Sequence, residues 1–151
     1  MNTGLMLPGD GHFQPVMEAV RHLSPSRQSE ELRGYMDWVE IQSFNSHEKA
    51  EIGMDHQLRD GLYMRTVRTP ANSIVCGAKF KKFGVSMLVK GKVSILSEQG
   101  CALLEAPLVF PTPAGSRKIG FCHSETILSV IFSVKGESLD EIEDELFSFE
   151  Y

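Results

Sequence analysis

The hydrophobic pattern of the chain changes at Gly61. From there on, apolar residues alternate with polar ones or form short runs, and turn residues interrupt them about every eight to twelve positions. This punctuation is typical of an all-β barrel or sandwich. The predicted strands span residues 62–68, 73–80, 85–89, 92–97, 102–105, 108–110, 117–123 and 126–134. The predicted turns are Gly91, residues 99–100 and residues 111–115.

Before Gly61, the apolar spacing is that of helices. Two sets of residues recur at intervals of three and four: Val16, Ala19, Val20 and Leu23, and then Leu32, Tyr35, Met36 and Val39. The Ser-Glu-Glu sequence at 29–31 suits the start of the second helix, and the Ser-Pro-Ser sequence at 24–26 separates the two. Residues 45–60 are polar and are predicted to form a loop.

A further helix is predicted near the end of the chain. Ser138 and Glu141 have the spacing of a capping box. Behind them runs an apolar stripe of Leu139, Ile142, Leu146 and Phe149. We expect this helix to pack on the barrel or on a neighbouring subunit, so the stripe is a predicted oligomer contact. The chain then divides into a helical extension with a linker (1–60), a β-barrel (61–134) and a C-terminal helix (135–151).

Composition narrows the classes of protein. The chain has 151 residues, of which 42% are hydrophobic, enough for one core. It has no apolar stretch long enough to span a bilayer and no signal-like start, so we expect the protein to stay where it is made, without a membrane partner. Three cysteines without a C-x-x-C spacing indicate reduced thiols. A net charge of −5 argues against nucleic acid as a partner.

Two short segments resemble the turn motifs of the cupin superfamily, which contain a turn glycine and a P-x-G sequence. They are GVSMLVKG at 84–91 and PAGSRK at 113–118. More narrowly, the ordered segments between 61 and 146 are similar to small cupin-like proteins encoded by tailed bacteriophages. This resemblance implies a mainly β fold, a cupin-type double-stranded β-helix or jelly-roll barrel with helices at both ends. It also implies a location in the cytoplasm of the infected bacterial host or in the virion.

The residues at the family's metal positions differ from the family pattern. The resemblance puts the cupin ligands, which are histidines and a glutamate, at Ala78, Phe80, Gly84 and Lys118 of this chain, and the phage-type histidines at Phe80, Gly84 and Phe132. A methyl group, a phenyl ring and a bare backbone donate no electron pair to a metal, and an ammonium group repels one. We therefore expect no metal and no other cofactor. These five positions are predicted to be a structural remnant in which Phe80 and Phe132 fill the core.

No other chemistry is evident. His123 is the only histidine in the predicted barrel, and no activated serine or cysteine is recognisable, so no catalytic residue is predicted. Alternation puts the following residues in the barrel interior: Phe80, Met87, Val89, Val93, Ile95, Phe121, Ile127, Ser129, Ile131 and Ser133. Basic residues that form either a solvated strand face or a patch for an anionic ligand or partner are Lys79, Lys81, Lys82, Arg117 and Lys118.

Two classes of function remain open. The first is a non-enzymatic, metal-free phage protein that acts as an assembly or virion-associated component or binds a host factor. Its partners would be a phage or host protein and itself, as a homo-oligomer with a dimer as the expected form. The second is a small-molecule cupin, enzymatic or sensing, whose site has moved. The lost ligand positions favour the first class.

Overall fold

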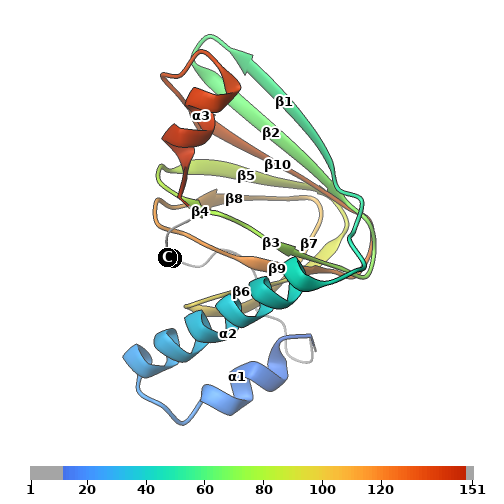
Figure 1. Cartoon of the computed structure of the whole chain (residues 1–151), viewed down its shortest axis with the longest axis vertical. Coiled ribbons are helices and arrows are strands. Elements are labelled where there is room, and N and C mark those ends of the chain that lie inside the picture. Colours follow the sequence, from blue (N-terminus) through green and yellow to red (C-terminus); the bar gives the residue numbers. More distant parts are fainter. Residues whose placement is uncertain (1–11, 149–151) are drawn as a thin grey trace.

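The fold is built on two antiparallel β-sheets that face each other, and the computed structural model describes residues 12–148 (Figure 1). The five-stranded sheet has the order β1 (Gly53–Arg59), β2 (Leu62–Thr69), β10 (Thr126–Ser133), β5 (Gly84–Lys90) and β8 (Leu108–Thr112). The four-stranded sheet has the order β3 (Ser73–Cys76), β9 (Ile119–Cys122), β6 (Lys92–Ser97) and β7 (Gly100–Glu105). A short pair joins β4 (Lys79–Phe80) to β11 (Phe147–Ser148). The strands predicted from alternation are thus confirmed to within a few residues, except that the predicted strand at 73–80 is divided into β3 and β4, which belong to different sheets.

Apolar side chains from both sheets fill the space between them. Leu88 of β5 and Phe110 of β8 meet Val93, Leu104 and Cys122 of the smaller sheet, and all five are buried. Because Leu88 points inward, its neighbours on the same strand must point outward. On β5, β9 and β10, the wrong set of alternate residues was therefore assigned to the barrel interior from the sequence. The misassigned residues, which face outward, are Met87, Val89, Phe121, Ile127, Ser129, Ile131 and Ser133.

Two helices cover the outer face of the four-stranded sheet. They are α1 (Gln14–Val20) and α2 (Pro25–Asn45), which lie together on one side of the molecule in Figure 1. Leu32 and Met36 of α2 pack against Leu96 and Ile119 of the sheet. The second helix begins at Pro25 rather than after residues 29–31, because a proline at the first helical position already has the φ that a helix needs. None of the helices in the described part of the chain combines the length and apolar character needed to span a bilayer.

The predicted loop at 45–60 was wrong over residues 53–59. It contains β1, which pairs with β2 along its whole length and forms one edge of the five-stranded sheet. Asp60 and Gly61 form the hairpin turn, with φ values of 53° and 77°. All seven residues of β1 are exposed, so no alternation of apolar and polar residues marks the strand. The barrel therefore begins at Gly53 and not at Gly61.

The C-terminal helix α3 (Leu139–Leu146) packs on the barrel of its own chain, beside β2 and β10 and away from α1 and α2 (Figure 1). The Ser138 cap is confirmed, but the reciprocal bond of the predicted capping box is made one residue earlier, at Glu137. The Glu141 amide donates to Ser138 Oγ over 3.2 Å, and the Glu137 amide donates to the Glu141 carboxylate over 2.8 Å. Ile142 and Leu146 are buried in a core cluster with Tyr63 and other residues of the large sheet. In the predicted oligomer stripe, only Leu139 is exposed, and Phe149 lies outside the described residues.

Candidate functional site

Three phenylalanines meet where the cupin resemblance puts the metal. Phe80 of β4, Phe132 of β10 and Phe147 of β11 have ring centroids 5.4 to 6.2 Å apart. Phe132 is 1% exposed, and Phe80 is half-buried. Ala78 packs against the same cluster. The β4–β11 pair brings Phe80 and Phe147 opposite each other in register, so the end of α3 completes the group. We call these three rings the aromatic cluster.

Gly84 lies directly against the aromatic cluster. A Cβ atom at this position would be 2.6 Å from Cε1 of Phe132 and 3.0 Å from the carbonyl oxygen of Ile131. Real Cβ atoms do not approach other atoms so closely, so the Phe132 ring occupies the space that a side chain at Gly84 would need. At the three positions where the resemblance implies histidines, Phe80 and Phe132 carry phenyl rings and Gly84 carries no side chain.

These residues do not fit a metal ion. Phe80, Gly84 and Phe132 offer carbon atoms only. Elsewhere between residues 12 and 148, no three histidine, cysteine or acidic side chains gather so that they could hold one. Burial raises the pKa of the Cys76 and Cys122 thiols, which favours the protonated form. The donor set of the cupin site is therefore absent from the part of the chain that is described.

A serine and a histidine meet on neighbouring strands, which the sequence alone did not reveal. Ser94 Oγ of β6 lies 2.6 Å from Nε2 of His123, just after β9. This distance suits a nucleophile and its base. The side chain of Ser94 is 0% exposed, however, and no described cavity is lined by it. A substrate could not reach its hydroxyl without rearrangement, so we assign the pair a structural role.

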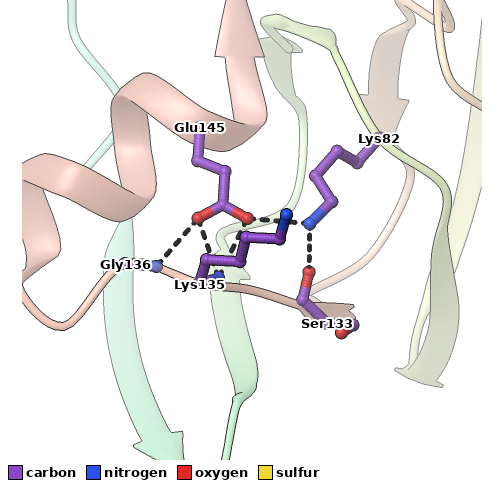
Figure 2. A network of polar contacts seen from close by, with 5 residues as sticks. All are labelled: Lys82, Ser133, Lys135, Gly136 and Glu145. Carbon is purple, nitrogen blue, oxygen red and sulfur yellow. Dashed lines mark hydrogen bonds and ion pairs between the residues drawn. The ribbon is translucent and has the colours of Figure 1, made fainter.

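The predicted basic patch divides into two groups. Lys81 and Lys82 hold α3: Lys81 Nζ donates to the Asp144 carbonyl oxygen over 2.7 Å, and Lys82 Nζ donates to the Glu145 carboxylate over 2.7 Å. Figure 2 shows that Glu145 also accepts from the amides of Lys135 and Gly136, each over 2.9 Å. These contacts hold the pKa of Glu145 down at about 2.

The other three basic residues line one cavity. Lys79, Arg117 and Lys118 surround a space of about 350 Å³ between α2, the β6–β7 turn and the 113–118 loop. Arg117 is fixed by ion pairs to Asp37 and Glu40 of α2, at 2.7 and 2.5 Å. We call this space the basic cavity. The basic cavity lies beside α2. Its lining residues come from distant segments of the chain, so the sequence alone did not reveal it.

Lys118 extends from the basic cavity towards the barrel core. Its Nζ lies 5.1 Å from the centroid of the Phe110 ring, a distance suited to a cation–π contact. Burial lowers the pKa of Lys118 to about 8. Among residues 12–148, no acidic side chain forms an ion pair with it. Lys118 is thus a half-buried amine without a counter-charge.

The outer face of the five-stranded sheet is apolar and uncovered by the described residues. Register alignment creates two rows across β2, β10, β5 and β8: Met64, Ile131, Val85 and Pro111, and then Thr66, Ser129, Met87 and Val109. Val85, Val89 and Val109 are 37%, 56% and 65% exposed. Charged side chains on this face are Asp55, Arg59 and Arg68 on β1 and β2, and Lys90 at the end of β5, which the register aligns with Arg68 through Ile127. We call it the outer sheet face.

Comparison with known proteins identifies the fold. The chain is similar to ectoine synthase from P. lautus, with a TM-score of 0.53 and 10% identity over 65% of this chain and 74% of that one. It is also similar to a cupin superfamily protein from Desulfitobacterium hafniense, with a TM-score of 0.51 and 10% identity over 63% and 88%. An acetylacetone dioxygenase from Acinetobacter johnsonii matches at 0.49 and 18% identity, over 56% of this chain and 61% of that one.

No family model matches the sequence, and no curated protein matches it. Identities this low establish the fold alone. The chain therefore has the predicted cupin-type fold, with helices at both ends, and the activities of its structural neighbours remain statements about those proteins.

Proposed function

We propose that this protein is a non-enzymatic, metal-free cupin-fold module that acts by binding proteins, first of all a second copy of itself. One observation carries the first half of the proposal. The Phe132 ring fills the space above Gly84, and the same region is closed by Ile142 and Leu146 of α3 and by Phe147 of β11. Cupin enzymes of the metal-dependent kind need ligands and an open pocket at this place, and the residues here supply core packing in their stead.

The outer sheet face supports the second half. Contiguous apolar surface on a folded protein marks an interaction site more often than chance, because exposing it to water is unfavourable. Here the exposed valines of β5 and β8 adjoin Met64 and Ile131 without an intervening charge. The α1 and α2 helices cover the opposite sheet, and α3 packs on the inner side of the large one. The described parts of the chain therefore leave this face for a partner.

A second copy is the occupant that we propose. Two identical faces related by a two-fold axis bury equal apolar surfaces against each other. The rim is compatible with this arrangement, because Asp55 and Arg59 provide both signs of charge on β1 and a two-fold axis reverses the strand. Leu139 of α3, which the sequence suggested as an oligomer contact, is exposed but stands alone, because Ile142 and Leu146 are buried in its own chain.

The biological setting that we propose rests on the resemblance to cupin-like proteins of tailed bacteriophages. In that setting the dimer is an assembly or virion-associated component, or it binds a host factor, in the cytoplasm of the infected host or in the virion. Mass spectrometry of purified virions separates the two roles, because a structural component is present in them at a fixed copy number.

Light scattering coupled to size-exclusion chromatography tests the dimer. We expect wild-type protein at micromolar concentration to have twice the mass of one chain, and Val109→Lys to have the mass of one chain with an unchanged circular dichroism spectrum. Leu139→Lys is the matched control and should remain a dimer. A monomeric wild-type protein, or a Leu139→Lys protein that dissociates while Val109→Lys does not, would show that the outer sheet face is not the interface.

A further inference from the structure

The basic cavity has an excess of positive charge that its own residues do not neutralise. Glu98 is the one acidic residue among those that line the cavity, and it pairs with Arg33 at 3.7 Å. Arg117 is matched by the acidic residues of α2. Lys79 and Lys118 remain, and within residues 12–148 neither forms an ion pair with an acidic side chain. Two lysines without an acidic partner among the described residues therefore line one partly open cavity.

The loop that forms one wall of the cavity carries a further unsatisfied group. Ser116 has a buried hydroxyl with no hydrogen-bond partner in the described structure. Buried polar groups in folded proteins nearly always have a partner, and an exception calls for an unseen ligand, ion or water. The same loop is held in place by backbone bonds to β4: the Phe80 amide donates to the Ser116 carbonyl oxygen over 3.0 Å, and the Gly115 amide donates to the Phe80 carbonyl oxygen over 2.7 Å. This wall of the cavity is therefore held in a defined conformation by backbone hydrogen bonds.

We propose that the basic cavity binds a small molecule through a phosphate or carboxylate group held by Lys79 and Lys118. Lysine ammonium groups bind such oxyanions as compact point charges, and both lysines line this cavity. A volume of about 350 Å³ lies within the range of small-molecule sites and exceeds what a single inorganic anion needs. The ligand is therefore a small organic anion. This site is independent of the proposed dimer, because it lies beside α2 and not on the outer sheet face.

The arrangement also explains why an amine is kept half-buried at Lys118. A cation without a partner in a partly apolar setting is unfavourable by itself, as its pKa of about 8 shows. An anion in the cavity supplies the missing counter-charge. Arg117 serves as a positioning residue, because its ion pairs to Asp37 and Glu40 tie the 113–118 loop to α2 and so keep the cavity formed.

Isothermal titration calorimetry with three probes tests the site: inorganic phosphate, citrate and adenosine monophosphate, with glucose as the neutral control. We expect at least one of the anions to bind with a dissociation constant below about 1 mM and glucose not to bind. In Lys118→Met and in Lys79→Met the affinity should fall roughly 10-fold or more, because each variant removes a charge-assisted contact. Lys81→Met removes the same charge from a residue outside the cavity and should bind like wild type.

Each other outcome overturns the proposal. If none of the three anions binds with a dissociation constant below about 10 mM, the cavity is not an anion-binding site. If binding survives in both Lys118→Met and Lys79→Met, or if Lys81→Met weakens it equally, the anion is attracted by the surface as a whole. Circular dichroism of each variant shows whether it is folded. The Val109→Lys monomer should bind the same anion with unchanged affinity, which separates this site from the proposed dimer interface.

Discussion

A Cβ atom at Gly84 would lie 2.6 Å from Cε1 of Phe132, so the ring of one residue stands in the place of the side chain of the other. The two positions are coupled: Phe132 can be this large only because residue 84 has no side chain. Phe132 in turn contacts Phe80 and Phe147, which links β10 to the short β4–β11 pair and through it to α3. The aromatic cluster therefore ties the large sheet to the C-terminal helix.

Gly84→Ala tests this coupling. We expect the variant to lose about 1–3 kcal/mol of unfolding free energy, because the new methyl group overlaps a buried ring that cannot move away freely. Gly34→Ala is the matched control, since a Cβ there meets nothing within 4 Å and alanine favours the α2 helix. It should be neutral or slightly stabilising. Both values come from urea denaturation.

The double variant Gly84→Ala with Phe132→Leu makes the test specific to this pair. The smaller leucine opens space for the added methyl group, so the double variant should be more stable than the sum of the two single effects predicts. Strict additivity would mean that the methyl group at position 84 clashes with the backbone of β10 and not with the ring.

Truncation of a phenylalanine in the aromatic cluster should lower the unfolding free energy, and more so the more deeply the ring is buried. Phe132 is 1% exposed, and Phe132→Ala should cost about 3–5 kcal/mol through lost burial and the cavity left behind. Phe80 is half-buried, so Phe80→Ala should cost less. Thermal unfolding of the two variants measures both effects. A shift of only a degree or two for Phe132→Ala would indicate a ligand pocket at this place in the fold and not core.

Glu145 makes the attachment of α3 sensitive to acid. Its pKa of about 2 lies below the ordinary carboxyl value of 4.5, because Lys82 and the amides of Gly136 and Lys135 stabilise the charged form. The resulting stability is fully present above pH 4.5 and is lost as the pH falls towards 2. Glu145→Gln should therefore lower the unfolding free energy at pH 7 by about 1–3 kcal/mol and weaken its decline between pH 4.5 and 2.

The matched control for this change is Glu143→Gln, which removes the same charge from the same helix. For the Glu143 carboxylate, no hydrogen bond or ion pair to another part of residues 12–148 is found. Its effect at pH 7 should be small. If Glu143→Gln and Glu145→Gln behave alike in a urea titration at several pH values, the network in Figure 2 contributes nothing specific to stability.

Lys118 should affect stability in the alkaline range. Burial lowers its pKa from 10.5 to about 8, so the folded protein gives up this proton more readily than the unfolded chain. Between pH 8 and 10.5 the unfolded state binds more protons, and wild-type stability should rise relative to that of Lys118→Met. At pH 7, without ligand, Lys118→Met should be the more stable protein. Parallel denaturation curves at pH 7 and pH 10 measure the difference. If the difference in unfolding free energy between the two proteins is the same at both pH values, the Lys118 ammonium group is in water and its pKa is not lowered.

The barrel could be predicted from the sequence because its turns are strongly marked, but which residues of β5, β9 and β10 point inward could not. On β5, the inward residues Ser86 and Leu88 alternate with the outward residues Val85, Met87 and Val89, which are at least as apolar. Alternation therefore favoured the wrong face. This error arose because the outer sheet face carries apolar residues, and exposed apolar residues cannot be distinguished from core residues by alternation alone.

Other features were hidden for different reasons. Strand β1 is exposed on both faces and has no periodicity, although the Asp60–Gly61 turn that begins β2 was a recognisable hairpin signal. The basic cavity brings Lys79 and Lys118 next to α2, and such proximity depends on how α2 packs on the smaller sheet. The packing of Phe80 and Phe132 in one aromatic cluster, in contrast, agrees with their apolar identity in the sequence.

Elemental analysis by inductively coupled plasma mass spectrometry, on protein purified without chelators or an affinity tag that binds metal, tests most directly whether the cupin site has become core. We predict far less than one zinc, iron, manganese or nickel per chain, because Phe80, Gly84 and Phe132 provide no donor atoms and the Phe132 ring fills the space. One equivalent of any of these metals per chain, retained after dialysis, would contradict this and restore an enzymatic cupin as the better explanation.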